Sequence, residues 1–309
     1  MENKAIPLCV DLDGTLVYND TVQESIIQLL KYRFLYVFVL PFWLLKGHAY
    51  VKRKIVSLIQ FDPSHLPYNQ AMIEYIKEEK KKGRKIVLAT ASDQVIAESV
   101  ANYLGLFDEV IGSDGHLSYA GKHKLAKLNK EYKKSGFVYA GNSTVDLSVW
   151  PNSKEVVVVT SSPSLLKKVK RFGKPIIAFP GRTFSYKDLV SFLHIKRWWS
   201  SSIVFLALFF YPINKVVILS CLGAYIILSF MTSAIGIVSD LVNHENDRKD
   251  PVKKHWPFAS GKVSVKDSLI VSVLLILTSI LASCFYPVYF TSMLCLYFVI
   301  SLVYCFSKS

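Results

Sequence analysis

The chain has 309 residues, enough for two domains, and its 37 lysines and arginines against 23 acids leave a net charge of +14. A charge of this size calls for nucleic acid or an anionic membrane surface as a partner. No nucleic-acid-binding motif accompanies the lysines, and 51% of the residues are hydrophobic. We therefore expect membrane lipids, and no nucleic acid, as partners. The five cysteines form no Cys-x-x-Cys pair, so neither a zinc site nor a disulfide framework is indicated.

A paired-carboxylate motif follows the first apolar run. Residues 6–10 are typical of a strand, and the next five read Asp-Leu-Asp-Gly-Thr. Side chains alternate along a strand, so Asp11 and Asp13 project to the same side, and Gly14 permits a sharp turn. Such a pair at the C-terminal edge of a sheet can hold Mg²⁺ and leave one carboxylate free to attack phosphorus. The alternative is an Asp-Gly turn with two solvated acids.

Two further segments end in polar residues after an apolar run. Residues 86–92 read as a buried strand that ends in hydroxyls. Residues 137–146 read as a strand, a glycine turn and two metal-binding residue types, Asn142 and Asp146. With a basic segment at 121–125, the four segments occur in the order of the four motifs of haloacid dehalogenase (HAD) phosphohydrolases. This part of the chain therefore resembles that family.

The resemblance implies a catalytic role for each matched residue. Asp11 would be the nucleophile that forms an aspartyl-phosphate, and Asp13 the general acid and then the general base. Thr90 would hydrogen-bond the phosphoryl group. Lys124, with Lys122 as the fallback, would offset the charge of phosphate and carboxylate. The alternative for these lysines is a solvated surface, which is what we expect of most lysines around them.

The same resemblance implies a Mg²⁺ site. The Asp11 carboxylate, the main-chain carbonyl of Asp13, Asp146 and Asn142 would surround the ion. Asn142 stands where the family usually has an acid, so it offers an amide carbonyl without negative charge. The metal and the lysine would remove the repulsion between a phosphate monoester and the carboxylate nucleophile.

The chain becomes strongly apolar after about residue 196. Four apolar runs cover residues 198–212, 216–238, 268–285 and 288–306. The second and fourth are long enough to cross a bilayer core of about 30 Å, whereas the first is short. The alternative, buried helices of a large soluble domain, leaves too few polar residues to cover four such runs. Basic residues precede the first run and separate the second from the third. We therefore expect an integral inner (cytoplasmic) membrane protein whose N-terminal domain, long loop and C-terminus face the cytoplasm.

The loop expected between the second and third runs carries a second charged cluster. The residues that we expect to bind a Mg²⁺-diphosphate are Asp240, Asn243, Asp247, Arg248, Lys253 and Lys254. The first three have helical spacing and can share one face, and the other three add phosphate-binding charge. With the Lys-Arg-Trp-Trp sequence at 196–199, this segment resembles the first Asp-rich motif of UbiA-type polyprenyl transferases, in particular the decaprenyl-phosphate phosphoribosyltransferase branch. The alternative is a polybasic loop that only binds lipid headgroups.

This second resemblance implies a lipid substrate. Members of that branch move 5-phosphoribose to a polyprenyl phosphate, so the expected ligand is a polyprenyl phosphate or a lipid-linked sugar phosphate. The sequence departs from the family, because Ser239 and Asn243 replace two motif residues and no acid follows Asp267. The transferase cavity is therefore not expected to close from this chain alone. We expect a fragment, a truncated gene, or a half-bundle that serves as an anchor, and a second chain could complete it.

The expected fold class is α/β and HAD-like, a doubly wound parallel sheet with a small helical cap, followed by an all-α transmembrane segment of about four helices. The HAD-like domain is expected over 1–190, with its cap over about 18–82, and the incomplete UbiA-like region over 191–309. The apolar segment 26–45 either rests on the membrane surface or forms an ordinary cap with a buried helix pair. The expected function is a membrane-tethered, Mg²⁺-dependent phosphohydrolase. The alternative is an inactive membrane remnant or assembly subunit of a UbiA-type transferase.

Overall fold

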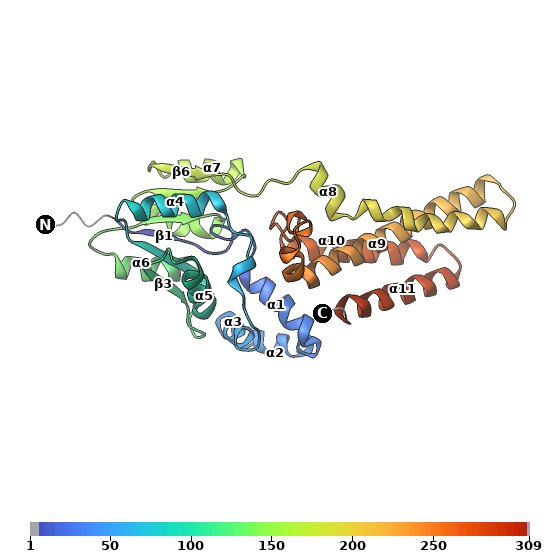
Figure 1. Ribbon diagram of the computed structural model, residues 1–309, viewed down its shortest axis with the longest axis horizontal. Helices are drawn as coiled ribbons and strands as arrows, with labels where there is room; N and C mark the ends of the chain where they lie inside the picture. Colours follow the sequence, from blue (N-terminus) through green and yellow to red (C-terminus); the bar gives the residue numbers. More distant parts are fainter. Residues whose placement is uncertain (1–5, 308–309) are drawn as a thin grey trace. The chain divides into compact units, whose positions relative to one another are not determined.

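The computed structural model describes residues 6–307. The chain divides into two compact units, Met1–Thr183 and Phe184–Ser309. The first contains a sheet covered by helices, and the second is helical throughout (Figure 1).

A six-stranded parallel sheet forms the centre of the first unit. Its strands are β1 (Leu8–Val10), β2 (Ile86–Asp93), β3 (Glu109–Ser113), β4 (Val138–Gly141), β5 (Val156–Val159) and β6 (Ile176–Phe179). Their order in the sheet is β3-β2-β1-β4-β5-β6, and all neighbours are parallel. After β1, the chain forms β2 and β3 on one side of that strand. It then crosses to the other side of β1 to form β4, β5 and β6. Open α/β sheets bind ligands at the carboxyl ends of the strands beside such a switch point.

The strands are buried on both faces, as their apolar sequences predict. Leu8 and Val10 belong to the core on one face and Cys9 to the core on the other, because strand side chains alternate. The four valines of β5 are all buried, since branched side chains suit a strand packed on both sides. The α/β fold class expected from the sequence is therefore confirmed.

Helices cover both faces of this sheet. The helices of the unit are α1 (Thr21–Tyr32), α2 (Leu40–Leu44), α3 (His48–Val56), α4 (Gln70–Lys81), α5 (Gln94–Leu104), α6 (Lys122–Glu131) and α7 (Pro163–Lys170). Short 3₁₀ helices are η1 (Phe34–Phe38), η2 (Pro63–His65), η3 (Thr144–Ser148) and η4 (Trp150–Asn152). The apolar residues of α4 and α5 pack on one face of the sheet, and those of α6 and α7 pack on the other.

The helices α1 to α3 form a cap with a small core of its own, whose buried members are Leu29, Trp43, Val51 and Ile55. In Figure 1 they gather apart from α4, which lies along the strands. Met72 and Ile76 of α4 belong to the core of the sheet. The cap of the structure therefore ends before α4 and is shorter than the expected range of 18–82.

The cap also exposes large apolar side chains. Those exposed over at least half of their surface between α1 and α3 are Tyr32, Phe34, Leu35, Phe38, Phe42, Leu44 and Leu45. Leu45, at 85%, is the most exposed of them. A contiguous apolar segment of this kind is unusual on a surface that faces water.

The second unit is built of helices of different lengths. They are α8 (Tyr186–Phe192), η5 (Ile195–Phe209), α9 (Lys215–Lys249), η6 (Lys253–His255), α10 (Val265–Ser283) and α11 (Val288–Ser307). By length and composition, α9, α10 and α11 are candidate membrane spans. Serines such as Ser272 and Ser279 are buried on α10 while Leu274 and Leu281 are exposed, which is typical of membrane helices that contact each other through small residues.

Two expectations about this unit need correction. The first expected span, 198–212, lies largely in η5, a 3₁₀ helix of 15 residues that is shorter than the candidate spans. The hydroxyls of Ser200 and Ser202 donate to carbonyls three residues earlier, and such bonds compete with regular α-helix. Residues 239–249, expected in a loop, form the last turns of α9. Neither glycine nor proline interrupts them before Pro251, and helices usually end at or before the residue preceding a proline.

Candidate active site

The two acids of the first motif follow β1 directly. The main-chain N–H of Asp11 donates to the carbonyl of Ala140 in β4 at 3.0 Å, so the pairing of the two strands continues to the acid. Gly14 has φ +75°, and a Cβ at this position would lie 2.0 Å from Nδ2 of Asn142. Glycine is required here by both the backbone conformation and the close approach of the fourth motif.

One hydrogen-bonded network joins three of the predicted residues. Lys124 Nζ, from α6, lies 2.7 Å from Asp11 Oδ1 and 2.7 Å from the hydroxyl of Tyr139. The Tyr139 hydroxyl in turn donates to Asp146 Oδ1 at 2.8 Å. Lys124, Tyr139 and Asp146 are buried, whereas Lys122 is exposed on the first turn of α6. The structure therefore brings Lys124, and not Lys122, to Asp11.

The Asp13 carboxylate is held by a separate set of donors. Oδ2 accepts a hydrogen bond from the Ser92 hydroxyl at 2.5 Å, and Oδ1 accepts one from the main-chain N–H of Thr21 at 2.8 Å. Thr90 is buried beside this pair, and its Oγ1 accepts from the N–H of Ser92 at 3.0 Å. Asp13 and Thr90 are thus linked through Ser92 at the end of β2.

Burial changes the acidity of both motif carboxyls. It raises the pKa of Asp11 to about 6, against the lowering effect of the Lys124 ammonium and with a further rise from the charge of Asp146. It raises the pKa of Asp13 to about 7, with Asp20 adding to the rise and hydrogen bonds to the carboxylate opposing it. A carboxyl with a pKa near neutrality can both donate and accept a proton under physiological conditions.

The fourth motif fixes Asp146 next to the first. Asp146 Oδ2 accepts from the N–H groups of Asn142 (3.0 Å) and Ser143 (2.9 Å) and from the Ser143 hydroxyl (3.1 Å). The side-chain oxygen of Asn142 lies 3.4 Å from the hydroxyl of Thr15 in the first motif. A Cβ at Gly141 would lie 2.7 Å from Cγ of Asp146, so the carboxylate rests directly on the backbone.

The acids of the second cluster each have a partner within the second unit. Asp240 Oδ2 lies 3.2 Å from Nε2 of His194, and Asp247 Oδ1 lies 3.1 Å from Nζ of Lys253. Asn243 donates its amide to a carbonyl one turn earlier on the same helix, at 3.0 Å. These three residues lie along α9 at helical spacing, but their polar atoms bond to different neighbours.

The other basic residues of the cluster are more scattered. Arg248 Nε donates to the carbonyl of Ala259 at 3.1 Å, and Lys254 is exposed in η6. Lys253 Nζ contacts the predicted acid Asp247.

Family comparisons assign the two parts of the chain. The model for haloacid dehalogenase-like hydrolases matches residues 31–149, and the model for the UbiA prenyltransferase family matches residues 198–309. The chain joins a HAD-like domain to a UbiA-family domain. A curated relative, the uncharacterized protein y4nM of Sinorhizobium fredii (strain NBRC 101917 / NGR234), is 28% identical over 315 residues. The alignment covers 98% of this chain and 59% of the relative's length.

Solved structures similar to the chain cover its HAD-like part. A phospho-aspartyl intermediate analogue of phosphoserine phosphatase is 19% identical, with a TM-score of 0.38, and the match covers 57% of this chain and 94% of the phosphatase. A protein with unknown function from Bordetella pertussis Tohama I is 14% identical, with a TM-score of 0.44, and the match covers 57% of this chain and 99% of that one.

The HAD-like domain offers oxygen ligands suited to Mg²⁺. Among residues 6–307, no three His, Cys, Asp or Glu side chains form a metal-binding group. At the end of β1, the Asp13 carboxylate accepts a hydrogen bond from Ser92. Two carboxylates remain, those of Asp11 and Asp146, and the charge of the second raises the pKa of the first. A cation would relieve this repulsion, and Mg²⁺ is commonly held by one or two carboxylates and several waters. The residues present therefore fit the ion.

Three residues of the HAD-like site were not predicted. Ser92 follows Thr90 by two residues in the same strand, so the two side chains point to the same side of the sheet. The alternation of side chains along a strand could therefore have revealed Ser92. Tyr139 reads as one more apolar residue of a buried strand. Lys52, from α3 of the cap, donates from Nζ to the carbonyl of Ala91 at 2.6 Å, and burial lowers its pKa against the charges of nearby acids that include Asp13. A lysine in a basic cap helix carries no signal that would set it apart.

Proposed function

We propose that the HAD-like domain hydrolyses phosphate monoesters through a covalent phosphoryl intermediate on Asp11. The observation that carries the proposal is the buried contact of Lys124 with Asp11, connected through Tyr139 to Asp146. The site combines a carboxylate nucleophile, an ammonium group and a second carboxylate at the ends of adjacent parallel strands. Such a site can bind a dianionic phosphate together with its counter-cation.

The reaction follows from the two carboxyls. An oxygen of Asp11 bonds to phosphorus while the ester oxygen leaves and takes the proton held by Asp13. Asp13, now ionised, accepts a proton from a water molecule whose oxygen attacks the same phosphorus. This second attack releases inorganic phosphate and restores the Asp11 carboxylate. Ser92 and Thr21 hold Asp13 in position for both proton transfers, and Thr90 hydrogen-bonds the phosphoryl group.

Mg²⁺ is the proposed cofactor of this domain. Asp11, the Asp13 carbonyl, Asp146 and the Asn142 side chain would hold it. When bound, the ion supplies positive charge that neutralises the phosphoryl oxygens.

The proposed substrate is a phosphate carried by a lipid, such as a polyprenyl-linked sugar phosphate. Three candidate spans follow the HAD-like domain in the chain, and the exposed apolar residues of the cap, including Phe38 and Leu45, can lie in a membrane interface. The basic segment between α9 and α10 supports a cytoplasmic position for that end of the helices, because basic loops stay on the cytoplasmic side. We therefore propose the cytoplasmic side of the inner membrane as the location of the HAD-like domain and the C-terminus.

Substitution of Asp11 tests the proposal directly. The full chain is purified in detergent and assayed with p-nitrophenyl phosphate and a panel of phosphoesters in the presence and absence of Mg²⁺. We expect Asp11→Asn to abolish Mg²⁺-dependent hydrolysis, and the matched change Asp62→Asn, at an exposed residue, to leave it intact. A wild-type chain that hydrolyses none of the esters contradicts the proposal.

A second candidate function, an anchor or assembly subunit without turnover, applies to the UbiA domain. Asp240 and Asp247 are each paired with a basic side chain of the same unit, and Asn243 donates to its own helix, which leaves the acids less available to a Mg²⁺-diphosphate. We propose that a second chain completes the helix bundle. Transfer of phosphoribose from phosphoribosyl diphosphate to polyprenyl phosphate by this chain alone would exclude the anchor role.

A further inference from the structure

Two adjacent basic residues of α3 connect the cap to the sheet. Lys52 Nζ donates a hydrogen bond to the carbonyl of Ala91 at 2.6 Å. Arg53 Nε lies 3.0 Å from Oδ2 of Asp93, the last residue of β2. The side chain of Asp93 is fully buried, and a buried carboxylate is costly to leave without a partner. The ion pair therefore holds α3 against the end of β2.

The short segment between these two contacts is also held by the sheet and by the next helix. The carbonyl of Ala91 accepts a second hydrogen bond, from the Ser113 hydroxyl at 2.8 Å, so both of its lone pairs are used. Asp93 Oδ1 accepts from the main-chain N–H of Val95 at 3.0 Å, which caps the start of α5. The backbone is therefore fixed on both sides of Ser92.

Ser92 connects this fixed segment to Asp13. Its hydroxyl carries one hydrogen, which it donates to Asp13 Oδ2 at 2.5 Å. The Thr21 hydroxyl, 3.0 Å from Ser92 Oγ, is then the donor in that contact. Thr21 is the first residue of α1, and its main-chain N–H donates to Asp13 Oδ1 at 2.8 Å. Both oxygens of Asp13 therefore depend on the cap, Oδ1 directly and Oδ2 through Ser92.

The two helices that make these contacts belong to one packed cap. Leu29 of α1 shares the core of the cap with Val51 and Ile55 of α3. Side chains that are closely packed in a common core hold their helices in a fixed relation. The position of α3 on β2 and that of α1 beside Asp13 are therefore set together.

We propose that Arg53 is a positioning residue that holds Asp13 ready for proton transfer when the cap lies on β2. The inference rests on the proposed phosphohydrolase function and adds the cap to its first step. In that step Asp11 bonds to phosphorus, the bond from phosphorus to the ester oxygen breaks, and Asp13 gives its proton to that oxygen, which keeps the electron pair. Without Arg53, the segment around Ser92 loses one of its attachments, and the direction of the acid is no longer fixed.

The leaving group of the ester separates this role from a purely structural one. p-Nitrophenolate is a stable anion and departs without a proton, whereas an alkoxide needs one from the acid. A misdirected Asp13 should therefore slow the cleavage of an alkyl phosphate and spare p-nitrophenyl phosphate. A damaged fold, or a weakened site for phosphate or Mg²⁺, would slow both esters.

The full chain is assayed in detergent with Mg²⁺ on p-nitrophenyl phosphate and on the alkyl phosphate that the wild type hydrolyses fastest. For Arg53→Met we expect kcat/KM to fall by at least about tenfold on the alkyl ester and to stay within about twofold on p-nitrophenyl phosphate. Asp93→Asn breaks the same ion pair from the side of the sheet, still caps α5, and should show the same split between the esters. Arg53→Lys should keep the alkyl activity within about threefold of wild type, because its ammonium lies one bond farther along the side chain than Nε and can reach Asp93.

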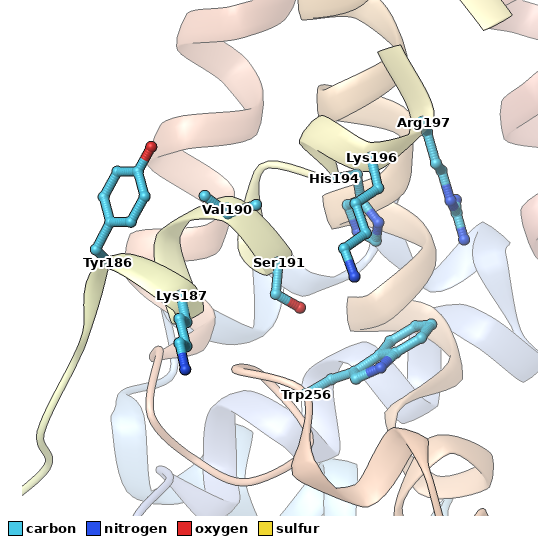
Figure 2. A pocket seen from close by; sticks show the side chains of 8 residues that line it. All are labelled: Tyr186, Lys187, Val190, Ser191, His194, Lys196, Arg197 and Trp256. Atoms are coloured by element: carbon cyan, nitrogen blue, oxygen red, sulfur yellow. The ribbon is translucent and has the colours of Figure 1, made fainter. Parts of the chain in front are cut away.

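Two control variants remove a positive charge elsewhere. Lys54→Met changes the next residue of α3, which is exposed. Lys187→Met changes a lysine of the second unit, which Figure 2 shows among the residues that line a cavity there. Both variants should keep kcat/KM for each ester within about twofold of wild type.

A double variant tests whether Arg53 acts through Ser92. Ser92→Ala should itself lower kcat/KM for the alkyl ester by at least about tenfold, since it removes the donor to Asp13 Oδ2. Adding Arg53→Met to Ser92→Ala should cost less than about twofold more, because both changes act on the same contact.

The inference is wrong if folded Arg53→Met and Asp93→Asn slow both esters equally or neither of them, or if the effect of Arg53→Met adds in full to that of Ser92→Ala. It is also wrong if the wild type cleaves p-nitrophenyl phosphate and no alkyl ester, since Asp13 would then donate no proton. Failure of the phosphohydrolase proposal looks different: the wild-type chain hydrolyses no ester, or Asp11→Asn keeps the activity.

Discussion

Replacement of Lys124 by methionine is the sharpest test of how the HAD-like site works. The change keeps the length of the side chain and removes one charge that lies 2.7 Å from Asp11 Oδ1. At an effective dielectric constant of about 20, two unit charges at this distance attract each other by about 6 kcal/mol. Desolvation of the pair cancels part of this attraction, and loss of one partner from a buried pair costs about 3–5 kcal/mol.

If the same free energy is lost from the transition state, the rate falls tenfold for each 1.4 kcal/mol. We expect kcat/KM for p-nitrophenyl phosphate to fall by about 10²- to 4 × 10³-fold in Lys124→Met. The matched variant Lys122→Met, on the exposed side of the same helix turn, should stay within about twofold of wild type. Tryptophan fluorescence of both variants checks that they fold. The reasoning is refuted if folded Lys124→Met keeps wild-type kcat/KM, or if Lys122→Met is the variant that loses it.

Three further results are expected. Tyr139→Phe removes the hydroxyl between the lysine and the second carboxylate, so kcat/KM should fall by about tenfold, and an unchanged value would show that the two groups do not need this link. The double variant Phe38→Asp/Leu45→Asp should lower hydrolysis of a lipid-borne phosphate in liposomes by about tenfold and leave p-nitrophenyl phosphate unaffected; equal loss on both substrates contradicts a membrane-facing cap. Burial raises the pKa of the Glu79 carboxyl, but hydrogen bonds from two basic neighbours outweigh it and hold the pKa below the usual 4.5. This stabilisation is complete above pH 4.5 and is lost as pH falls through the lowered pKa. The difference in Tm between wild type and Glu79→Gln should therefore be present at pH 7 and shrink as the pH is taken below 4.5; a constant difference would be inconsistent.

The sequence predicted the parts of the HAD-like site that follow strands. An apolar run that ends in Asp11 and another that ends before Asp146 imply parallel strands whose carboxyl ends meet, and the structure places both acids at that edge. The contribution of Tyr139 could not be predicted, because a tyrosine in a buried strand packs as an apolar residue until its hydroxyl meets a partner from elsewhere in the chain. Lys52 reaches the end of β2 only because the cap folds over that strand. Lys52 and its partner Ala91 lie far apart in the sequence, so no local sequence pattern indicates their contact.

The membrane part was harder to predict in detail. Apolar length predicted the regions of α9, α10 and α11, but it also predicted a span in what is the 3₁₀ helix η5. Hydropathy counts apolar residues and does not register that Ser200 and Ser202 bond back to the chain. The polar composition of 239–249 suggested a loop, although its residues are all compatible with helix, and the preceding apolar turns extend directly into it.

The uninterrupted length of α9 sets the depth at which its polar end can lie. Its 35 residues span about 52 Å at 1.5 Å per residue, whereas the hydrocarbon layer is about 30 Å thick. If Lys215 marks one boundary of that layer, Asp240 lies about 38 Å along the rod, roughly 8 Å beyond the other boundary. This is the level of lipid phosphates, so a polyisoprenoid ligand could present its phosphate there while its hydrocarbon tail stays dissolved among the acyl chains.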